Sequence, residues 1–462
     1  MSGFSSLNIG TRALFAAQRA LDVTGQNVSN ANTEGYSRQR VEQAALGASL
    51  VPAMFSRWDG VGGGVDVTGL TRVRDDFLEA RAQQQHASNA SMSTTQQVYA
   101  DIETTFGEPS ESALQKQMSD FWNAWDEVAN DPAAPAPRSE LLEQADGLAG
   151  SFNSVAGRLT QQWSDTREQL AATVADVNTM AADIAKLNST IRASSVAGVP
   201  ANELADQRDA LVLALGDAIG ATATKGDDGT VDVALGGSPL VLGDRARTLA
   251  VTGPAGYTGA PGTVGVVWDD GSGYPVTGLG GTTSARLAAL DTVLPSYLSA
   301  LDDVAASLAT TVNAQQAAGF DLSATAGGPA NGRPMFSGTT ASTLTLVLRN
   351  PAGLAASSAA PPDANGDNAL ATAAHAADVG GAGAAYRQLV VTLGVQAQSV
   401  NRQADVQAAV TTQIDNARMS ASGVSLDEEM TNLVMYQHAY EAAARFVNAI
   451  DSTLDTLINM TR

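Results

Sequence analysis

The chain of 462 residues contains no cysteine and only three lysines, Lys116, Lys186 and Lys225. The absence of cysteine excludes disulfide bonds, thiolate metal sites and thiol nucleophiles. Acidic residues outnumber basic residues by 48 to 26, which gives a formal net charge of −22 and a pI near 4.4. Because binding to a phosphate backbone needs a basic surface, we expect no nucleic acid among the partners of this protein.

The sequence also lacks the segments that insert a protein into a membrane or direct it there. No stretch approaches the roughly 18 uninterrupted apolar residues of a transmembrane helix, so we expect no membrane partner. The N-terminus, MSGFSSLNIGTRALFAAQ, has neither a positively charged start nor a continuous apolar core, so we expect no cleavable signal peptide. Taken alone, these absences predict a cytoplasmic protein.

Hydrophobic residues are plentiful although aromatic residues are few. Hydrophobic residues make up 44% of the chain and aromatic residues make up 5% of it, and alanine is abundant. This composition is sufficient for packed cores and suits long helices that approach closely through small side chains. The length allows two to four domains.

Both ends of the chain carry apolar residues at intervals of seven, the spacing that keeps one face of a helix against a partner in a coiled coil. A second row follows three residues later in the C-terminal segment. We call the following twelve residues the predicted assembly face: Leu7, Leu14, Leu21, Val28, Leu426, Leu433, Tyr436, Tyr440, Val447, Ile450, Leu454 and Leu457. The pattern predicts one of two arrangements. Either the termini pair with each other or with neighbouring subunits, or both are core-facing helices of one globular domain.

The sequence around these rows distinguishes the two arrangements. Residues 27–39 read NVSNANTEGYSRQ, and residues 423–459 read GVSLDEEMTNLVMYQHAYEAAARFVNAIDSTLDTLIN. They resemble the signatures of bacterial flagellar rod, hook and hook-associated proteins. NELADQRDAL at 202–211 and the stretch 284–320 are similar to internal segments of the hook-associated proteins at the junction of hook and filament. The resemblance touches both termini and is weakest at 221–281 and 322–385.

This resemblance implies a structural component of the bacterial flagellum, not an enzyme. It implies assembly at the hook tip as the hook–filament junction adaptor, through the terminal helices. The implied partners are further copies of the chain in a ring, the hook protein, the next hook-associated junction protein, and a cytoplasmic export chaperone at the C-terminal helix. The resemblance also implies type III export without a cleaved signal peptide and an extracellular location, which overrides the cytoplasmic prediction. A hook or rod type axial protein is the alternative within the group.

The resemblance assigns a family turn motif after the first helix: Asn27, Asn30, Asn32, Gly35 and Tyr36. Asparagine and glycine tolerate left-handed backbone, so we expect these residues to stop the helix and shape the turn. Arg38 and Gln39 follow, either to contact a neighbouring subunit or to begin a solvated strand.

The periodicity predicts a mainly α fold with β insertions. Terminal helices at 1–45 and 422–462 form a coiled-coil-like domain, which the resemblance places in the inner tube. Long helices form an inner helical bundle domain, and Gly-, Thr- and Val-rich segments form a small outer β-rich domain. The inner domain comprises 46–220, 284–320 and 385–421, and the outer domain comprises 221–283 and 321–384.

Several local patterns make sharper predictions. A long helix at 139–195 carries a heptad row from Trp163 to Ile191, and Trp122 and Trp125 are expected to be buried anchors. Asn202 is expected to cap the helix that follows it. TLTLVLR at 343–349 alternates as a strand does.

We find no catalytic, cofactor or metal site in the sequence. The acidic run 427–429 is explained by a capping box of Ser425 with Glu428 and by the helix dipole. The three histidines, His86, His375 and His438, lie far apart, and no nucleophile, base and orienting group can be assembled from them. An enzyme displayed on a flagellar scaffold would need a clustered catalytic set between 221 and 383, where His375 is the one histidine.

Overall fold

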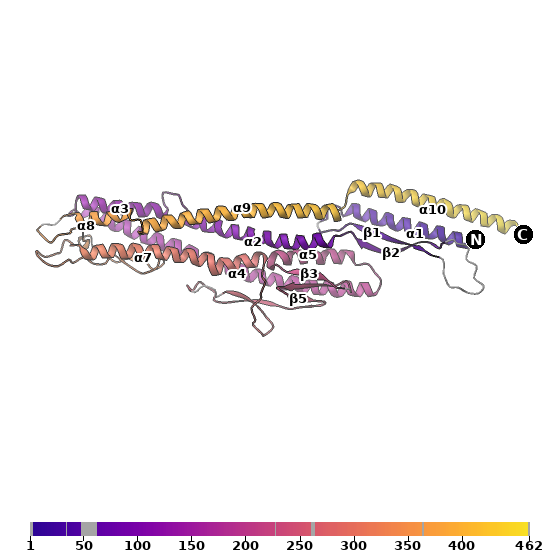
Figure 1. Cartoon of the computed structure of the whole chain (residues 1–462), viewed down its shortest axis with the longest axis horizontal. Helices are drawn as coiled ribbons and strands as arrows, with labels where there is room; N and C mark the ends of the chain where they lie inside the picture. Colours follow the sequence, from indigo (N-terminus) through magenta and orange to yellow (C-terminus); the bar gives the residue numbers. More distant parts are fainter. Residues whose placement is uncertain are drawn as a thin grey trace. The chain divides into compact units, whose positions relative to one another are not determined.

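A computed structural model describes residues 3–33, 35–47, 62–226, 228–259, 264–362 and 365–460. The fold is mainly helical with a few small sheets, as the sequence predicted (Figure 1). None of the helices in these ranges is long and apolar enough to cross a membrane. The part of the predicted inner domain at 48–61 lies outside the described residues.

The chain divides into two compact units, each built from several segments. Unit 1 comprises Met1–Ala87, Asn178–Arg247 and Ala409–Arg462, and unit 2 comprises Ser88–Val177 and Thr248–Ala408. Three of the four boundaries fall inside long helices, α2 (Asp76–Phe106), α4 (Pro135–Val196) and α9 (Ala382–Ser422), and the fourth falls between Arg247 and Thr248. The predicted division into three domains therefore stays a prediction.

Unit 1 contains the terminal helices and two antiparallel sheets. Its further elements are α1 (Gly3–Ser29), β1 (Gln39–Leu46), β2 (Gly64–Arg72), α5 (Asn202–Ile219), β3 (Thr222–Lys225), β4 (Val231–Leu235), β5 (Ser238–Leu242), β6 (Arg245–Ala246) and α10 (Leu426–Met460). Strands β1 and β2 pair with a bulge between Glu42 and Gln43, and the second sheet has the order β3-β4-β5-β6. Figure 1 shows α1 and α10 side by side.

Unit 2 is built around helices and two small sheets. Its further elements are α3 (Leu114–Asn130), β7 (Leu249–Thr252), β8 (Gly265–Trp268), α6 (Gly281–Ala288), a π turn η1 (Ala289–Val293), α7 (Leu294–Ala318), β9 (Phe336–Ser337), β10 (Thr345–Leu346), η2 (Pro351–Gly353), α8 (Asp367–Ala374) and η3 (His375–Ala377). Strand β7 pairs with β8, and β9 with β10, each antiparallel.

Aromatic side chains fill the core of unit 2, as predicted for the tryptophans. Trp122, Trp125 and Trp163 are all buried. The ring of Phe121 lies 5.0 Å from that of Trp122 and 5.9 Å from that of Phe336, measured between centroids. The Nε1–H of Trp163 donates to a backbone carbonyl of the π turn at 2.9 Å, which satisfies its polar atom. The heptad row along α4 is buried throughout, so it is a packing face.

Two local predictions were wrong. Asn202 does not cap α5, because Ala201 occupies the N-cap position and makes no side-chain cap bond. The strand predicted at 343–349 shortens to Thr345–Leu346. Its alternation is real, because Leu344, Leu346 and Leu348 are buried, but only two residues join a hydrogen-bonded ladder.

Candidate functional site

The terminal helices α1 and α10 pack against each other within unit 1. The two helices approach each other closely at Gly10 of α1. A Cβ atom there would lie 2.7 Å from Cγ2 of Val447 and 3.0 Å from Cδ1 of Phe446. These distances are shorter than van der Waals contact, so glycine lets the backbone of α1 approach α10. The two chain ends therefore form one paired element.

The predicted assembly face keeps part of its surface accessible in this pair. None of its twelve residues is buried. Leu426, Tyr440 and Leu457 have exposed fractions of 51%, 40% and 58%, and the other nine are half-buried. An apolar face of this kind is usually covered, so the accessible part of the α1–α10 pair is the candidate functional site of the chain.

Helix α10 exposes further large apolar side chains that the heptad search did not find. They are Met430, Val434, Met435, Phe446, Ile458 and Met460. Met435, Phe446 and Leu457 lie at intervals of eleven residues, or about three helical turns, so they share one face. A helix that is apolar on several sides is normally buried on several sides. An eleven-residue search of the sequence would have found this row.

The family turn motif fixes the end of α1 through its first residue. Asn27 is 1% exposed. Its Nδ2 donates to the backbone carbonyl of Gln39 at 2.9 Å and to Oε2 of Glu429 at 3.0 Å. Its Oδ1 accepts from the backbone N–H of Gln39 at 3.0 Å and from the hydroxyl of Tyr36 at 2.9 Å. The amide therefore ties α1 to β1 and to the first turn of α10.

The rest of the motif shapes the turn itself. Asn30 donates from Nδ2 to the carbonyl of Gln26 at 3.0 Å, which supports the last turn of α1. Gly35 has a φ of 78°, the left-handed conformation that the sequence led us to expect. Asn32 is exposed. Burial, reinforced by the nearby Asp206, Glu203 and Glu429 carboxylates, raises the pKa of Tyr36 to about 12.

Arg38 binds the acidic run at the start of α10. Its guanidinium lies 2.7 Å from Oε2 of Glu428 and 2.7 Å from Oε1 of Glu429. Its backbone N–H donates to the carbonyl of Ser422 at 3.0 Å, at the end of α9. Burial lowers the pKa of Arg38, but the two carboxylates more than offset this and raise it overall. Arg38 and the buried Gln39 therefore make contacts within the chain, and they do not begin a solvated strand.

The capping interpretation of the acidic run was half right. The Oγ of Ser425 accepts from the backbone N–H of Glu428, but at 3.5 Å. The Glu428 side chain turns to Arg38 and does not complete the reciprocal capping box. The carboxylates therefore hold the terminal segment in addition to favouring the helix N-terminus.

The internal motif on α5 lies against the same segment. The Nδ2 of Asn202 donates to Oε1 of Gln39 at 3.0 Å and to the carbonyl of Leu70 at 3.3 Å. Oε1 of Glu203 accepts from Nε2 of Gln26 at 2.6 Å. Asn202 is thus a bridge to β1 and β2, which is why it does not serve as a cap.

Charged residues continue this connection from α5 to β2. Arg72 lies 2.8 Å from Asp206 and 2.8 Å from Asp209, and Asp206 also accepts from the backbone N–H of Ser37 at 3.2 Å. Although burial raises the pKa of Asp209, the Arg74, Arg72 and Arg208 guanidiniums lower it overall. We call Asn27, Arg38, Gln39, Asp206 and Glu429 the terminal lock, since together they join α1, β1, α5 and α10.

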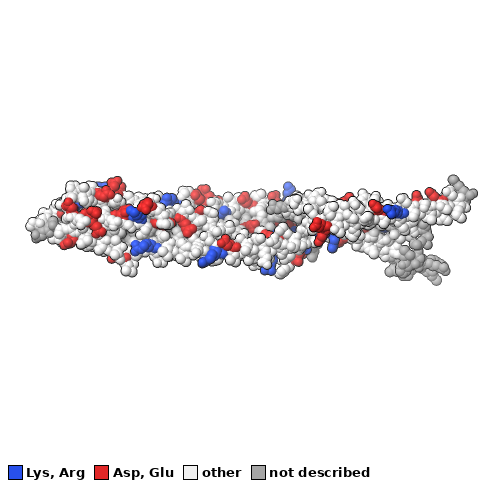
Figure 2. All heavy atoms as spheres, turned by 90° about the horizontal axis from the view of Figure 1, so that it is seen from above, with Lys and Arg blue, Asp and Glu red and all other residues white. Residues whose placement is uncertain are grey.

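The histidines are not part of a shared site. His86 of α2 lies 3.0 Å from Asp415 and 3.6 Å from Asp217, and His375 lies 2.6 Å from Asp378. His438 is exposed on α10. Within the described ranges, no group of three or more His, Cys, Asp or Glu side chains is arranged to hold a metal ion. On the face drawn in Figure 2, acidic and basic side chains are dispersed among uncharged ones without a continuous basic patch.

Three family models match this chain. Residues 99–336 match the flagellar hook-associated protein FlgK helical domain. Residues 416–460 match the C-terminal model of the flagellar basal body rod FlgEFG proteins, and residues 7–36 match the flagella basal body rod protein model. The two terminal matches fall on α1 with its turn motif and on the end of α9 with α10.

Individual relatives agree with these models. The chain is 30% identical to flagellar hook-associated protein 1 of Bacillus subtilis, over 99% of this chain and 98% of the relative. It is 27% identical to flagellar hook-associated protein 1 of Escherichia coli, over 99% and 100%. The flagellar hook junction protein FlgK from Burkholderia pseudomallei has a similar fold, with a TM-score of 0.62 at 18% identity, over 76% of this chain and all of that one. The chain belongs to the flagellar hook-associated protein 1 family, whose members are structural components of the flagellum rather than enzymes.

Proposed function

We propose that this protein is the adaptor subunit between hook and filament, and that it assembles through α1 and α10. The observation that carries this proposal is the exposed apolar surface of α10, in particular the row Met435, Phe446 and Leu457. This surface continues the predicted assembly face on a helix whose beginning is held by the terminal lock. Neighbouring copies in a ring, the hook protein on one side and the next junction protein on the other would cover it.

The terminal lock makes this surface usable. Hydrogen bonds are directional, so the contacts of Asn27 and Arg38 fix the direction in which α10 leaves α9. An interface binds more tightly when its surface is held in the bound arrangement before association. The apolar rows then contribute the association energy and the lock contributes the orientation.

Leu426→Glu and Leu457→Glu test the proposal. Both positions are more than half exposed in the monomer, so the variants should fold normally. In a subunit interface each would bury a carboxylate without a partner, at a cost of several kcal/mol that is repeated at every subunit. We expect both variants to be exported but to leave hooks without filaments, as counted by electron microscopy together with flagellin lost to the medium.

The matched control is His438→Glu, which places the same carboxylate at an exposed polar position of the same helix. It should support normal filaments and swimming. Normal filaments on both leucine variants would show that the assembly surface lies elsewhere.

Before export, the exposed apolar surface of α10 would need to be covered by another protein. An exposed apolar helix face favours premature association, so we propose that a cytoplasmic chaperone binds α10 and that the chain is exported without a cleaved signal peptide. Calorimetry with the purified chaperone should show weaker binding of Leu457→Glu than of His438→Glu. Equal affinities would exclude the chaperone site, and a shortened N-terminus in the secreted protein would exclude uncleaved export.

A further inference from the structure

Methionines are concentrated on the exposed surface of the C-terminal segment. Of the ten in the chain, Met419, Met430, Met435 and Met460 have exposed fractions of 62%, 53%, 53% and 78%. Others are core residues, such as Met118, which is 1% exposed. Peroxides oxidise sulfur atoms that they can reach, so this contrast decides which thioethers react.

Two of these methionines lie within the apolar surface of α10. Met435 begins the row that continues through Phe446 and Leu457. Met430 lies four residues after Leu426 and four before Val434, so these three side chains are neighbours on the helix. A thioether is apolar and flexible and adapts to partners of different shape. The sulfoxide is polar and would no longer suit a dry interface.

The composition of the chain favours oxidation at Met430 and Met435. The chain contains no cysteine, so no thiolate competes for the oxidant. Met430 and Met435 also lie outside the terminal lock and outside the core. Their oxidation would change the surface of α10 and leave the folded monomer intact.

We propose that Met430 and Met435 form an oxidation site that controls whether the free subunit can assemble. This inference rests on the proposed function. The thioether sulfur attacks one oxygen of a hydroperoxide, the O–O bond breaks and an S–O bond forms. The second oxygen leaves as hydroxide and takes up the proton that the transferred oxygen releases, so hydrogen peroxide gives one sulfoxide and one water. Sulfur loses two electrons, which the peroxide gains, and a methionine sulfoxide reductase with a thiol reductant reverses the change.

The site acts between export and assembly. In the free subunit Met430 and Met435 are each 53% exposed, whereas in the proposed interface a neighbouring chain would cover them. A peroxide would therefore stop new subunits from joining without dismantling junctions that are already built.

The first test treats the full-length monomer with hydrogen peroxide and follows each methionine by peptide mass spectrometry. Met430 and Met435 should be oxidised about tenfold or more faster than Met118 and Met335, in keeping with their exposure. The thermal unfolding midpoint should not change. Equal rates for exposed and buried methionines, or a fall in the midpoint, would overturn the proposal.

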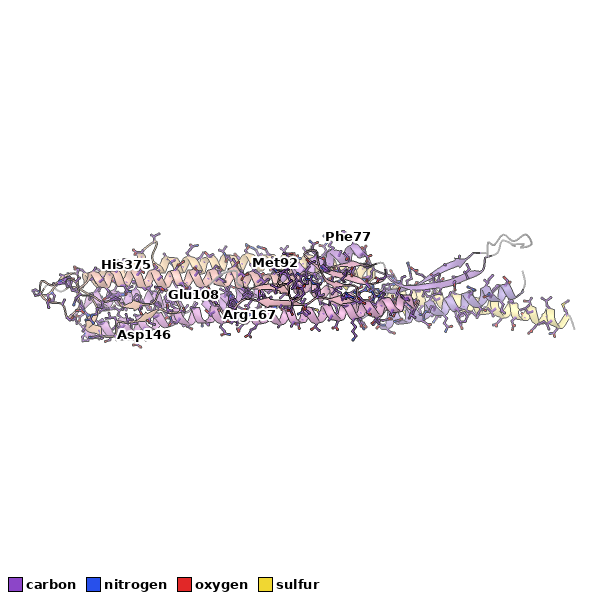
Figure 3. The ribbon with its side chains drawn as sticks, turned by 90° about the horizontal axis from the view of Figure 1, so that it is seen from below. Phe77, Met92, Glu108, Asp146, Arg167 and His375 are labelled. Atoms are coloured by element: carbon purple, nitrogen blue, oxygen red, sulfur yellow. The ribbon has the colours of Figure 1, made fainter. Side chains whose placement is uncertain are left out.

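The second test supplies the purified protein to hook-bearing cells that lack it and counts filaments. Peroxide treatment should lower the count about tenfold, and reductase treatment should restore it. The double variant Met430→Leu/Met435→Leu conserves volume and should assemble equally well with or without peroxide. The control Met92→Leu/Met180→Leu, with Met92 on α2 as labelled in Figure 3, should stay sensitive.

Two outcomes would overturn the inference: full assembly of the oxidised protein, or equal loss in the Met430→Leu/Met435→Leu variant. Leu457→Glu separates this failure from failure of the proposed function. If Leu457→Glu fails to assemble while the oxidised protein assembles, only the oxidation site is wrong. If Leu457→Glu assembles normally, the assembly surface itself is wrong and the oxidation site falls with it.

Discussion

Asn27→Ala is the most informative single substitution in the terminal lock. It removes both donor bonds and both acceptor bonds of a side chain that is 1% exposed. The backbone N–H and carbonyl of Gln39 would then be buried without these partners. The carboxylate of Glu429, which is 2% exposed, would lose one of its donors.

The magnitude follows from these losses. An unsatisfied buried polar group costs about 1–3 kcal/mol, and a hydrogen bond to a charged group contributes about 1.5–3 kcal/mol. Alanine regains roughly 0.5 kcal/mol of helix propensity, and water entering the space would recover part of the rest. We expect a net loss of about 3–5 kcal/mol in the stability of the segment that contains α1, β1 and the start of α10.

Hydrogen exchange is the appropriate assay, because a chain with two compact units need not unfold in one step. Protection of the amide of Gln39 and of the amides in the first turns of α10 should fall by about two to four orders of magnitude, as the free energy implies. Asn32→Ala, at an exposed asparagine of the same motif, should change the opening free energy obtained from these protection factors by less than about 0.5 kcal/mol. If Asn27→Ala matches this control, the hydrogen bonds of Asn27 do not stabilise the terminal segment and the terminal lock is misassigned.

Two further predictions concern other contacts within unit 1. Gly25→Ala and Gly10→Ala, both in α1, should have opposite effects on the urea midpoint. A Cβ at Gly25 meets nothing within 4 Å and should stabilise by about 0.5–1 kcal/mol, whereas at Gly10 it meets the branched side chain of Val447 and should destabilise by about 1–3 kcal/mol. A gain at both positions would refute close packing at Gly10. Asp217 and Asp415 raise the pKa of His86 by hydrogen bonding and charge, and this effect outweighs burial, which lowers the pKa. Arg418 also forms an ion pair with Asp415. Its folded-state pKa therefore exceeds the unfolded value near 6.5, so its contribution to stability is complete at lower pH and disappears as the pH rises through the folded-state pKa. His86→Gln should destabilise most near pH 5.5 and least above pH 8, and a difference independent of pH would contradict this.

Periodicity was sufficient to predict the elements that bury one continuous face. The heptad row on α4 and the three tryptophans are buried as expected, because the spacing of apolar residues along a helix indicates which face is buried. The same logic was incomplete on α10. A search at intervals of seven finds the side that faces a single partner, and it does not find Met435 or Phe446.

The terminal lock could not be predicted because its members are distant in sequence. Asn27 and Glu429 are separated by 402 positions, and no local pattern indicates that they meet. Asn202 shows why local rules gave the wrong answer there. Its type and position suited an N-cap, but its amide makes two bonds to β1 and β2 instead, so tertiary contacts outweighed the local preference.

Helix α10 has directional polar contacts at its beginning and apolar side chains on its outer surface, and this arrangement agrees with what a junction subunit must do. Such a subunit has to meet different neighbours on its two sides, while its own orientation has to be the same in every copy. Directional contacts of Asn27, Arg38 and Glu429 fix the orientation inside the chain, where the partner never changes. Outside the chain, α10 presents Met, Leu and Phe side chains, whose contacts do not depend on direction and which can pack against more than one shape. The reverse arrangement would not work. Apolar contacts in the terminal lock would let α10 rotate, and polar contacts on its outer surface would suit only one neighbour.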